Sequence, residues 1–329
     1  MILINLSGEH PDLPLEEVEA LYEAYGKKPD IILRGGRLLL VKNDLEKSAL
    51  ARLALTHEFY EVAELADAAR LDEVLLGLKV KKPESYRVRC LGFDYNAGEE
   101  RRAGGVLFDA WQERGWKPRV KMEKPALEIY LIKVGDKVAI SFGKNETDDF
   151  RKRDTNKRPF FHPLALNPKL ARLFLNLARL REGDKVLDPF CGSGSILIEA
   201  TLMGMEAIGG DRDHNMLWGC AKNMAFYGVK AETFGGDATD IKLKKLDAIV
   251  TDPPYAKSSK VFSKDLQTLY DGFLKSAFKA IKPGGHLVLA VPTEAKLNYG
   301  PAGFEKRGDY KYYVHRSLTR RIYILRRPK

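Results

Sequence analysis

The second half of the chain alternates between short apolar runs and segments whose apolar residues recur every three or four positions. The apolar runs predict buried strands, centred on Val186, Ala207, Ala248 and Leu287. The clearest helical segment extends from Leu266 to Ile281 and ends at Pro283-Gly284-Gly285. Because strands and helices alternate, we expect an α/β fold in which helices cover both faces of a parallel sheet.

Three further segments complete the predicted elements of this half. A helix is expected at residues 169–180, and two β-rich alternating runs follow near the end of the chain. These runs, at residues 310–317 and 320–326, predict a terminal antiparallel hairpin.

The first half predicts two smaller α/β units. Residues 1–58 show a strand at 1–6, a helix at 15–25, a hairpin at 31–41 and a helix at 45–55. Residues 59–145 show strands at 85–91, 119–122, 126–133 and 137–142 and a helix at 104–114. A polar stretch at residues 146–160 then leads to the last domain, residues 161–329, and is interpreted as a linker. Its arginines could contact phosphates, although a solvated linker is the favoured interpretation.

The composition adds the charge of the chain, which is +10 over 329 residues. A basic chain of this length indicates two or three domains with a polyanionic partner such as nucleic acid. No apolar stretch is long enough to span a bilayer, no signal segment is recognised, and Cys90, Cys191 and Cys220 form no metal or disulfide pattern. We therefore expect a cytoplasmic monomer with no membrane segment and no metal site.

The sequence Asp252-Pro253-Pro254-Tyr255 follows the apolar run that ends at Val250. The carboxylate and the Pro253 carbonyl can accept hydrogen bonds from a planar amine and so aim its lone pair. Pro254 would stiffen the turn, and Tyr255 could stack on the base that carries the amine. The four residues favour methylation of an exocyclic base nitrogen, although a Pro-Pro turn that merely ends a strand has the same sequence.

A glycine-rich turn lies upstream, between a predicted strand and a helix that opens at Ser195. Its residues are Asp188-Pro189-Phe190-Cys191-Gly192-Ser193-Gly194. Such a turn lets a nucleotide-like ligand approach the backbone closely. Since the full G-x-G-x-x-G pattern is absent, a hydride-transfer enzyme is the less favoured alternative.

Two further acids end short predicted strands. Asp211 follows the glycine turn by about twenty positions, where a carboxylate can bind both hydroxyls of a ribose. Asp237, within Gly235-Gly236-Asp237-Ala238, is spaced to reach an adenine edge. Each acid alone is also compatible with a helix cap or a turn, but the ordered set of motifs indicates a nucleoside site.

In this order the motifs resemble the S-adenosylmethionine-dependent methyltransferases of the Rossmann-like class I, and the D-P-P-Y variant resembles their amino-methylating branch. The resemblance covers residues 161–329 and implies a seven-stranded, mostly parallel sheet with S-adenosylmethionine as cofactor. It implies that the cofactor is bound by His162, Pro163, Asp188, Pro189, Phe190, Cys191, Gly192, Ser193, Gly194, Asp211, Arg212, Asp237 and Ala238. A structural role for His162 is equally compatible with the sequence.

Basic and aromatic residues are interleaved in residues 59–145. Together with the segment 120–129, this pattern resembles the THUMP domain of RNA-modifying enzymes, and residues 1–58 resemble the ferredoxin-like domain that accompanies it. The resemblance implies binding to the acceptor end of tRNA. The candidate RNA-binding residues are Lys81, Lys82, Arg87, Arg101, Arg102, Arg119, Lys121, Arg151 and Arg153. An ordinary solvated face is the alternative.

The combination of domains resembles the archaeal THUMP-containing tRNA guanine-N2 methyltransferases that act on guanosine 10. That family implies transfer of one or two methyl groups to N2 of a guanosine in tRNA, with Asp252, the Pro253 carbonyl and Tyr255 holding the base. Two alternatives remain open. One is an adenine-N6 methyltransferase acting on RNA or DNA, and the other is a tRNA-binding protein whose methyltransferase domain has decayed.

Overall fold

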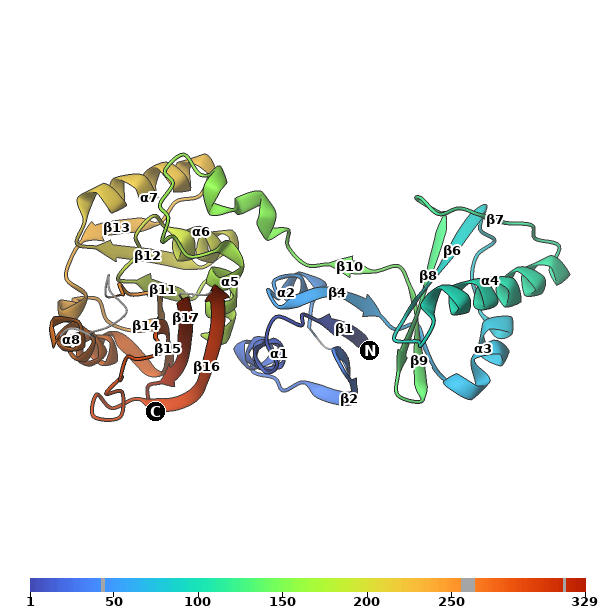
Figure 1. Cartoon of the computed structure of the whole chain (residues 1–329), viewed down its shortest axis with the longest axis horizontal. Helices are drawn as coiled ribbons and strands as arrows, with labels where there is room; N and C mark the ends of the chain where they lie inside the picture. Colours follow the sequence, from blue (N-terminus) through green and yellow to red (C-terminus); the bar gives the residue numbers. More distant parts are fainter. Residues whose placement is uncertain (43–44, 256–263, 316–317) are drawn as a thin grey trace. The chain divides into compact units, whose positions relative to one another are not determined.

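The computed structural model of the chain describes residues 1–42, 45–255, 264–315 and 318–329 (Figure 1). Its internal contacts divide the chain into two compact units. The first unit consists of residues 1–9, 29–51 and 56–147, and the second of residues 10–28, 52–55 and 148–329. The chain passes from the first unit to the second for the last time between residues 147 and 148, within the stretch interpreted as a linker. The four-part division into domains stays a prediction.

The second unit is built on a seven-stranded sheet with the order β13-β12-β11-β14-β15-β17-β16 (Figure 1). Its strands are β11 (Lys185–Asp188), β12 (Glu206–Asp211), β13 (Glu232–Gly235), β14 (Leu246–Thr251), β15 (Ile281–Pro292), β16 (Glu305–His315) and β17 (Leu318–Arg326). Strands β11 to β15 pair in parallel, whereas β17 is antiparallel to both β15 and β16. The predicted mostly parallel sheet and its terminal hairpin are confirmed.

Apolar side chains of this sheet alternate between two core clusters, one on each face. On β14, Ala248 and Val250 belong to one cluster and Ile249 to the other. The first cluster includes residues of α1 (Leu13–Ala24), α5 (Pro168–Leu177), α6 (Ser195–Leu202) and α7 (His214–Phe226), and the second includes residues of α8 (Lys264–Ala280). A strand buried on both faces needs a continuous apolar run, which is why β14 was recognisable in the sequence.

Helix α1 packs in the second unit, although its sequence lies among strands of the first unit. The buried carboxylate of Glu17 accepts hydrogen bonds from the backbone N–H groups of Ala54 and Leu55 and from the Asn176 amide, each at 2.7 Å. Arg52 donates to the amide oxygen of Asn176 at 2.8 Å. A buried carboxylate with three donors is well satisfied, so α1 is an integral part of this unit.

The first unit contains two five-stranded sheets, with the orders β10-β4-β1-β3-β2 and β5-β9-β8-β6-β7. The former consists of β1 (Ile2–Leu6), β2 (Asp30–Gly35), β3 (Leu38–Lys42), β4 (Thr56–Glu61) and β10 (Asn145–Glu146). The latter consists of β5 (Glu64–Asp67), β6 (Ser85–Leu91), β7 (Arg119–Val120), β8 (Leu127–Val134) and β9 (Lys137–Phe142). The helices are α2 (Lys47–Ala51), α3 (Leu71–Gly77) and α4 (Asn96–Glu113). Among the described residues, no helix combines the length and the apolar character needed to cross a membrane.

Helix α4 begins at Asn96, well before the predicted start at Gly104. The prediction was wrong because adjacent glycines at 104 and 105 favour a break, whereas Ala103, Leu107 and Trp111 anchor one face of the helix in the core. Tertiary burial outweighs the helix-breaking tendency of two glycines. Arg101 and Arg102 therefore lie within this helix rather than before it.

The predicted solvated linker is also partly wrong. Residues 150–153 and 155–157 form short 3-10 helices, η2 (Phe150–Arg153) and η3 (Thr155–Lys157). The side chain of Arg153 is only 11% exposed and Arg158 is buried. Charged residues in this stretch are thus partly internal to the second unit.

Candidate active site

A cavity of about 350 Å³ lies where the parallel strands of the second unit end. Among the predicted site residues, its lining includes His162, Asp188, Pro189, Phe190, Cys191, Gly192, Ser193, Asp211, Arg212, Asp237, Ala238, Asp252 and Pro254. Pro163, Gly194, Pro253 and Tyr255 are chain neighbours of lining residues but are not part of the lining. The sequence interpretation missed Leu164, Ala165, Leu166, Ser195, Ile196, Met216 and Leu269, which line the cavity as well. These are mostly apolar positions without a local chemical signature.

The glycine turn depends on the backbone conformation of its glycines. Gly192 and Gly194 have φ angles of 50° and 88°, in the left-handed region that glycine tolerates best. A Cβ atom at position 194 would also lie 2.7 Å from the Cys220 sulfur. The turn closes through a hydrogen bond of 2.8 Å from the Gly194 N–H to the Cys191 carbonyl, and α6 begins directly afterwards.

Asp188 is the most buried carboxylate in the cavity lining, with 2% of its surface exposed. It accepts hydrogen bonds from the Thr251 hydroxyl at 2.6 Å and from the Phe190 N–H at 3.1 Å. Burial raises the pKa of Asp188 to about 7, and the neighbouring charges of Asp211 and Asp252 act in the same direction. The carboxylate is therefore poised to gain from a positively charged ligand.

Asp211 ends β12 and has both oxygens engaged by the backbone. It accepts from the Gly192 N–H and from the Asp213 N–H, each at 2.9 Å. Each carboxylate oxygen has a second lone pair, so the side chain can still accept from two ligand hydroxyls.

Asp237 caps a short 3-10 helix, η4 (Ala238–Asp240). Its side chain accepts from the N–H and the hydroxyl of Thr239 at 2.9 and 2.8 Å, and an Arg212 nitrogen lies 3.9 Å from its other oxygen. The Thr239 N–H is the main cause that lowers the pKa of Asp237. The alternative of a helix cap is thus realised here, although the residue also lines the cavity.

Asp252 follows β14 and is held by two side chains. Arg320, from β17, donates to one carboxylate oxygen at 3.0 Å and to the other at 3.4 Å, and the Tyr255 hydroxyl also donates to the second oxygen. Burial raises the pKa of Asp252, while the Arg320 guanidinium opposes that rise. Tyr270 fixes the loop from α8, because its hydroxyl donates to the Pro254 carbonyl at 2.9 Å.

Arg320 is the functional candidate that the sequence interpretation missed. It belongs to an alternating strand in which an arginine is normally assigned to the solvent face, and its partners lie more than sixty positions away. Yet only 7% of its surface is exposed. The available signal was its position on the same strand face as Ile322 and Ile324, which indicates that the Arg320 side chain points toward the core.

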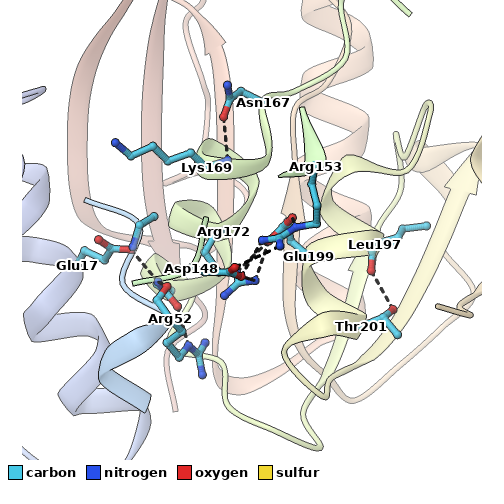
Figure 2. Close-up of polar contacts among 12 residues, drawn as sticks. Glu17, Arg52, Asp148, Arg153, Asn167, Lys169, Arg172, Leu197, Glu199 and Thr201 are labelled. Atoms are coloured by element: carbon cyan, nitrogen blue, oxygen red, sulfur yellow. Dashed lines mark hydrogen bonds and ion pairs between the residues drawn. The ribbon is translucent and has the colours of Figure 1, made fainter. Parts of the chain in front are cut away.

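An ionic cluster supports α6, which opens at the glycine turn. The fully buried carboxylate of Glu199 forms ion pairs with Arg153 at 2.6 Å and with Arg172 at 2.7 Å, and Asp148 pairs with both arginines (Figure 2). Arg153, a candidate for RNA contact, is directed into this cluster. Arg151 is exposed and pairs with Asp149 at 2.9 Å.

The candidate RNA residues of the first unit fall into two groups. Arg87 pairs with Glu128, and Arg102 pairs with Glu99 and Asp72. Lys81, Lys82, Arg101, Arg119 and Lys121 have exposed side chains, and the paired Arg102 is exposed as well. Arg87 and Arg101 also line a hollow of about 500 Å³ between β6, α4 and the β7 edge.

The cavity of the second unit suits the cofactor implied by the sequence. S-adenosylmethionine carries a sulfonium and an ammonium group, and the lining presents Asp188, Asp211, Asp237 and Asp252 against Arg212. Burial is the main cause of the raised pKa of Asp188, and the nearby charges of Asp211 and Asp252 add to it. A cationic ligand of nucleoside type therefore fits the residues that are present.

Comparisons with known proteins agree with this geometry. A family model described as "RMKL-like, methyltransferase domain" matches residues 155–322, and one described as "DNA methylase" matches residues 46–218. The chain is 34% identical to the tRNA (guanine(10)-N2)-dimethyltransferase of Methanothermobacter thermautotrophicus and 31% identical to that of Pyrococcus abyssi, over 99% of each chain in both cases.

A solved structure, TrmN from Thermus thermophilus, superimposes with a TM-score of 0.56 at 23% identity and covers 99% of both chains. At that level of identity the likeness concerns the fold. It supports the assignment of the α/β architecture.

Proposed function

This chain belongs to the family of the tRNA (guanine(10)-N2)-dimethyltransferases, and we propose that its target is N2 of guanosine 10, which receives one or two methyl groups. The chain is an S-adenosylmethionine-dependent tRNA (guanine-N2)-methyltransferase. The position in tRNA, the number of methyl groups and the roles of individual residues are the proposed part. The observation that carries these roles is the Asp252 carboxylate, only 12% exposed, in the lining of the same cavity as Asp188 and Asp211.

Asp252 and the Pro253 carbonyl would orient the amine of the guanine. The lone pair of an aryl amine is delocalised into the ring, so two acceptors at fixed angles are needed to turn it toward the methyl donor. S-adenosylmethionine supplies an electrophilic methyl group when it is bound. Correct positioning of the two reactants can contribute about 7 to 11 kcal/mol to lowering the barrier.

Asp252 would also follow the charge that develops on nitrogen during transfer. The methylated amine is acidic and loses its proton to Asp252 or to water. Tyr255 would stack on the guanine, a contact worth about 1 to 3 kcal/mol. A stacked guanosine in a stem must leave the helix to reach this cavity, which requires a few kcal/mol.

In the same cavity, Asp188 and Asp211 would hold the cofactor. Asp188 would accept from the ammonium of the methionine part, and Asp211 would accept from the two ribose hydroxyls. His162, Arg212, Asp237 and Ala238 would complete the nucleoside end. The exposed basic residues of the first unit would bind the phosphates of tRNA.

The test is incubation of the protein with unmodified tRNA and labelled S-adenosylmethionine, followed by nucleoside analysis by mass spectrometry. The matched substrate carries a base-pair exchange that replaces guanosine 10, and the matched enzyme is Asp252→Ala. We expect N2-methylguanosine or N2,N2-dimethylguanosine only from the wild-type pair. Methylation that persists without guanosine 10 would refute the assigned position.

Adenine-N6 methylation is the second candidate, because a family model of DNA methylases also matches the chain. That match ends at residue 218, before the loop that would hold the amine. Methyladenosine in the same assay, on tRNA or on DNA, would favour this alternative. The alternative of a decayed enzyme is set aside, since the chain belongs to a family of enzymes and retains its cavity acids.

A further inference from the structure

Arg320 is a buried cation placed beside the loop that would hold the amine. Strand β17 lies next to β15, with Arg320 in register with Pro292 at the end of β15. Its side chain reaches the end of β14, where one guanidinium nitrogen is 3.0 Å from an Asp252 oxygen. Another is 2.9 Å from the Tyr255 hydroxyl, so one guanidinium contacts both residues.

The two oxygens of Asp252 have different main partners in this arrangement. Oδ2 accepts from Arg320 Nη2 at 3.0 Å, whereas Oδ1 accepts from the Tyr255 hydroxyl and has only a longer contact of 3.4 Å with Arg320 Nε. The Tyr255 hydroxyl is a neutral donor, like the amine of a guanine. A substrate amine can therefore replace it at Oδ1 while the Arg320 contact at Oδ2 is kept.

We propose that Arg320 is a positioning residue for methyl transfer, which pairs with the Asp252 carboxylate and fixes Oδ2 so that Oδ1 is presented to the amine. In the absence of a base, the Tyr255 hydroxyl occupies Oδ1 and is exchanged for the amine on binding. This inference rests on the proposed role of Asp252 as the acceptor for the target amine.

The charged and titratable groups around Asp252 show why a cation is needed there. Asp188, from the neighbouring strand β11, interacts unfavourably with Asp252, and Tyr255 and Tyr270 present neutral hydroxyls. Burial raises the pKa of Asp252, and Arg320 is the cation that opposes this rise. A neutral Asp252 would offer an O–H where the amine needs an acceptor.

Arginine suits this position better than lysine does. Its planar guanidinium presents several N–H donors in a fixed fork, so it can bind a carboxylate and a hydroxyl at once. A lysine in the same place would restore the charge but would contact fewer partners. The two substitutions therefore separate the effect of charge from the effect of geometry.

The experiment compares Arg320→Met, Arg320→Lys and wild type in the full chain. For each we would measure kcat and KM on unmodified tRNA over a range of pH, and cofactor affinity by calorimetry. Arg320→Met should lower kcat at neutral pH by about 100-fold and shift the acid limb of the kcat profile to higher pH. Arg320→Lys should keep the acid limb near its wild-type position and recover part of kcat.

The control is Arg321→Met, the next residue along the strand. Arg321 is 33% exposed and pairs with Asp309 on β16, so its loss should leave kcat and the pH profile unchanged. Cofactor affinity within about twofold of wild type in every variant would show that the fold is intact.

The proposal is overturned if Arg320→Met and Arg320→Lys lower kcat equally without moving the acid limb. It is also overturned if both variants change only KM. Should Arg320→Met fail to fold, an acid limb that Arg320→Lys moves to higher pH would contradict the proposal by itself. Analysis of the wild-type product separates a failure of the proposed function from a failure of the Arg320 proposal. Methyladenosine as the product would refute the guanine target, and the variants would then be compared by their formation of methyladenosine.

Discussion

Asp188 and Asp252 lie at the carboxyl ends of neighbouring parallel strands but have different partners. Asp188 is the last residue of β11, Asp252 directly follows β14, and each has a pKa raised by burial. Asp252 is paired with Arg320. In the part of the chain that the structure describes, the hydrogen-bond donors found at Asp188 are the neutral Thr251 hydroxyl and the Phe190 N–H.

The difference separates a carboxylate whose charge the protein compensates from one whose charge a ligand must compensate. Asp252 has its own cation, which favours the ionised form that works as an acceptor. Asp188 gains a cationic partner only when a positively charged group enters the cavity. One sheet edge can thus present one acid to the methyl donor and another to the base.

A third carboxylate, Glu199, is buried between Arg153 and Arg172. Its substitution tests how much an acid that is paired by the protein alone stabilises the fold. Glu199→Gln should destabilise the protein by about 3 to 5 kcal/mol, because Arg172 and the largely buried Arg153 lose the charge of Glu199 and, among the described residues, keep only Asp148 as a carboxylate partner. Urea unfolding measures this change. Glu206→Gln, which breaks an exposed pair with Lys185, should change stability by less than about 0.5 kcal/mol. Equal effects of the two substitutions would show that the buried cluster contributes nothing specific.

The role of Asp252, the acid that is paired with Arg320, is tested by Asp252→Asn. This substitution removes the charged acceptor, so kcat should fall by about 100- to 1,000-fold. Cofactor affinity should stay within about twofold, because Asp188 and Asp211 are intact. Asp240→Asn, an exposed acid on η4, is the matched control. A parallel loss of cofactor affinity in Asp252→Asn would erase the distinction between the two acids.

Much of the fold followed from the sequence because it depends on local patterns. Strands buried on both faces leave continuous apolar runs, and the acids of the cavity come directly after such runs. The position of Asp188, Asp211 and Asp252 at one sheet edge is then a consequence of parallel pairing.

The parts that could not be predicted depend on contacts between distant segments. Burial of Arg320 needs the pairing of β15 with β17, and an arginine in an alternating strand gives no local sign of it. The packing of α1 depends on Glu17 meeting Asn176, which lies 159 positions away. The early start of α4 likewise depends on Ala103 and Leu107 meeting their core.

The role of Asp188, the acid without a cation partner among the described residues, is tested by the pH dependence of cofactor affinity. The folded-state pKa of Asp188 is about 7, above its usual value, so its protonation favours the folded state at low pH and this contribution is lost as pH rises toward 7. A bound cation favours the ionised form and must displace the proton. Cofactor affinity should therefore fall by up to about tenfold for each pH unit below 7. Calorimetry at pH 6 and 8 measures this, and Asp188→Asn should flatten the dependence. A wild-type affinity that does not change with pH would refute the role of Asp188.

The smallest expected effect concerns the hydroxyl that occupies Asp252 in the absence of a base. Tyr255→Phe keeps the ring for stacking but removes the donor at Oδ1, so the amine no longer has to displace a hydroxyl. The net value of one neutral hydrogen bond predicts a KM for tRNA that is lower by about twofold. Tyr255→Leu removes the stacking ring as well and should raise KM by about fivefold or more. The two substitutions thus act in opposite directions if the hydroxyl competes with the amine and the ring supports it. A KM raised equally by both would instead mean that the hydroxyl itself contacts the substrate, and the exchange at Asp252 would have to be abandoned.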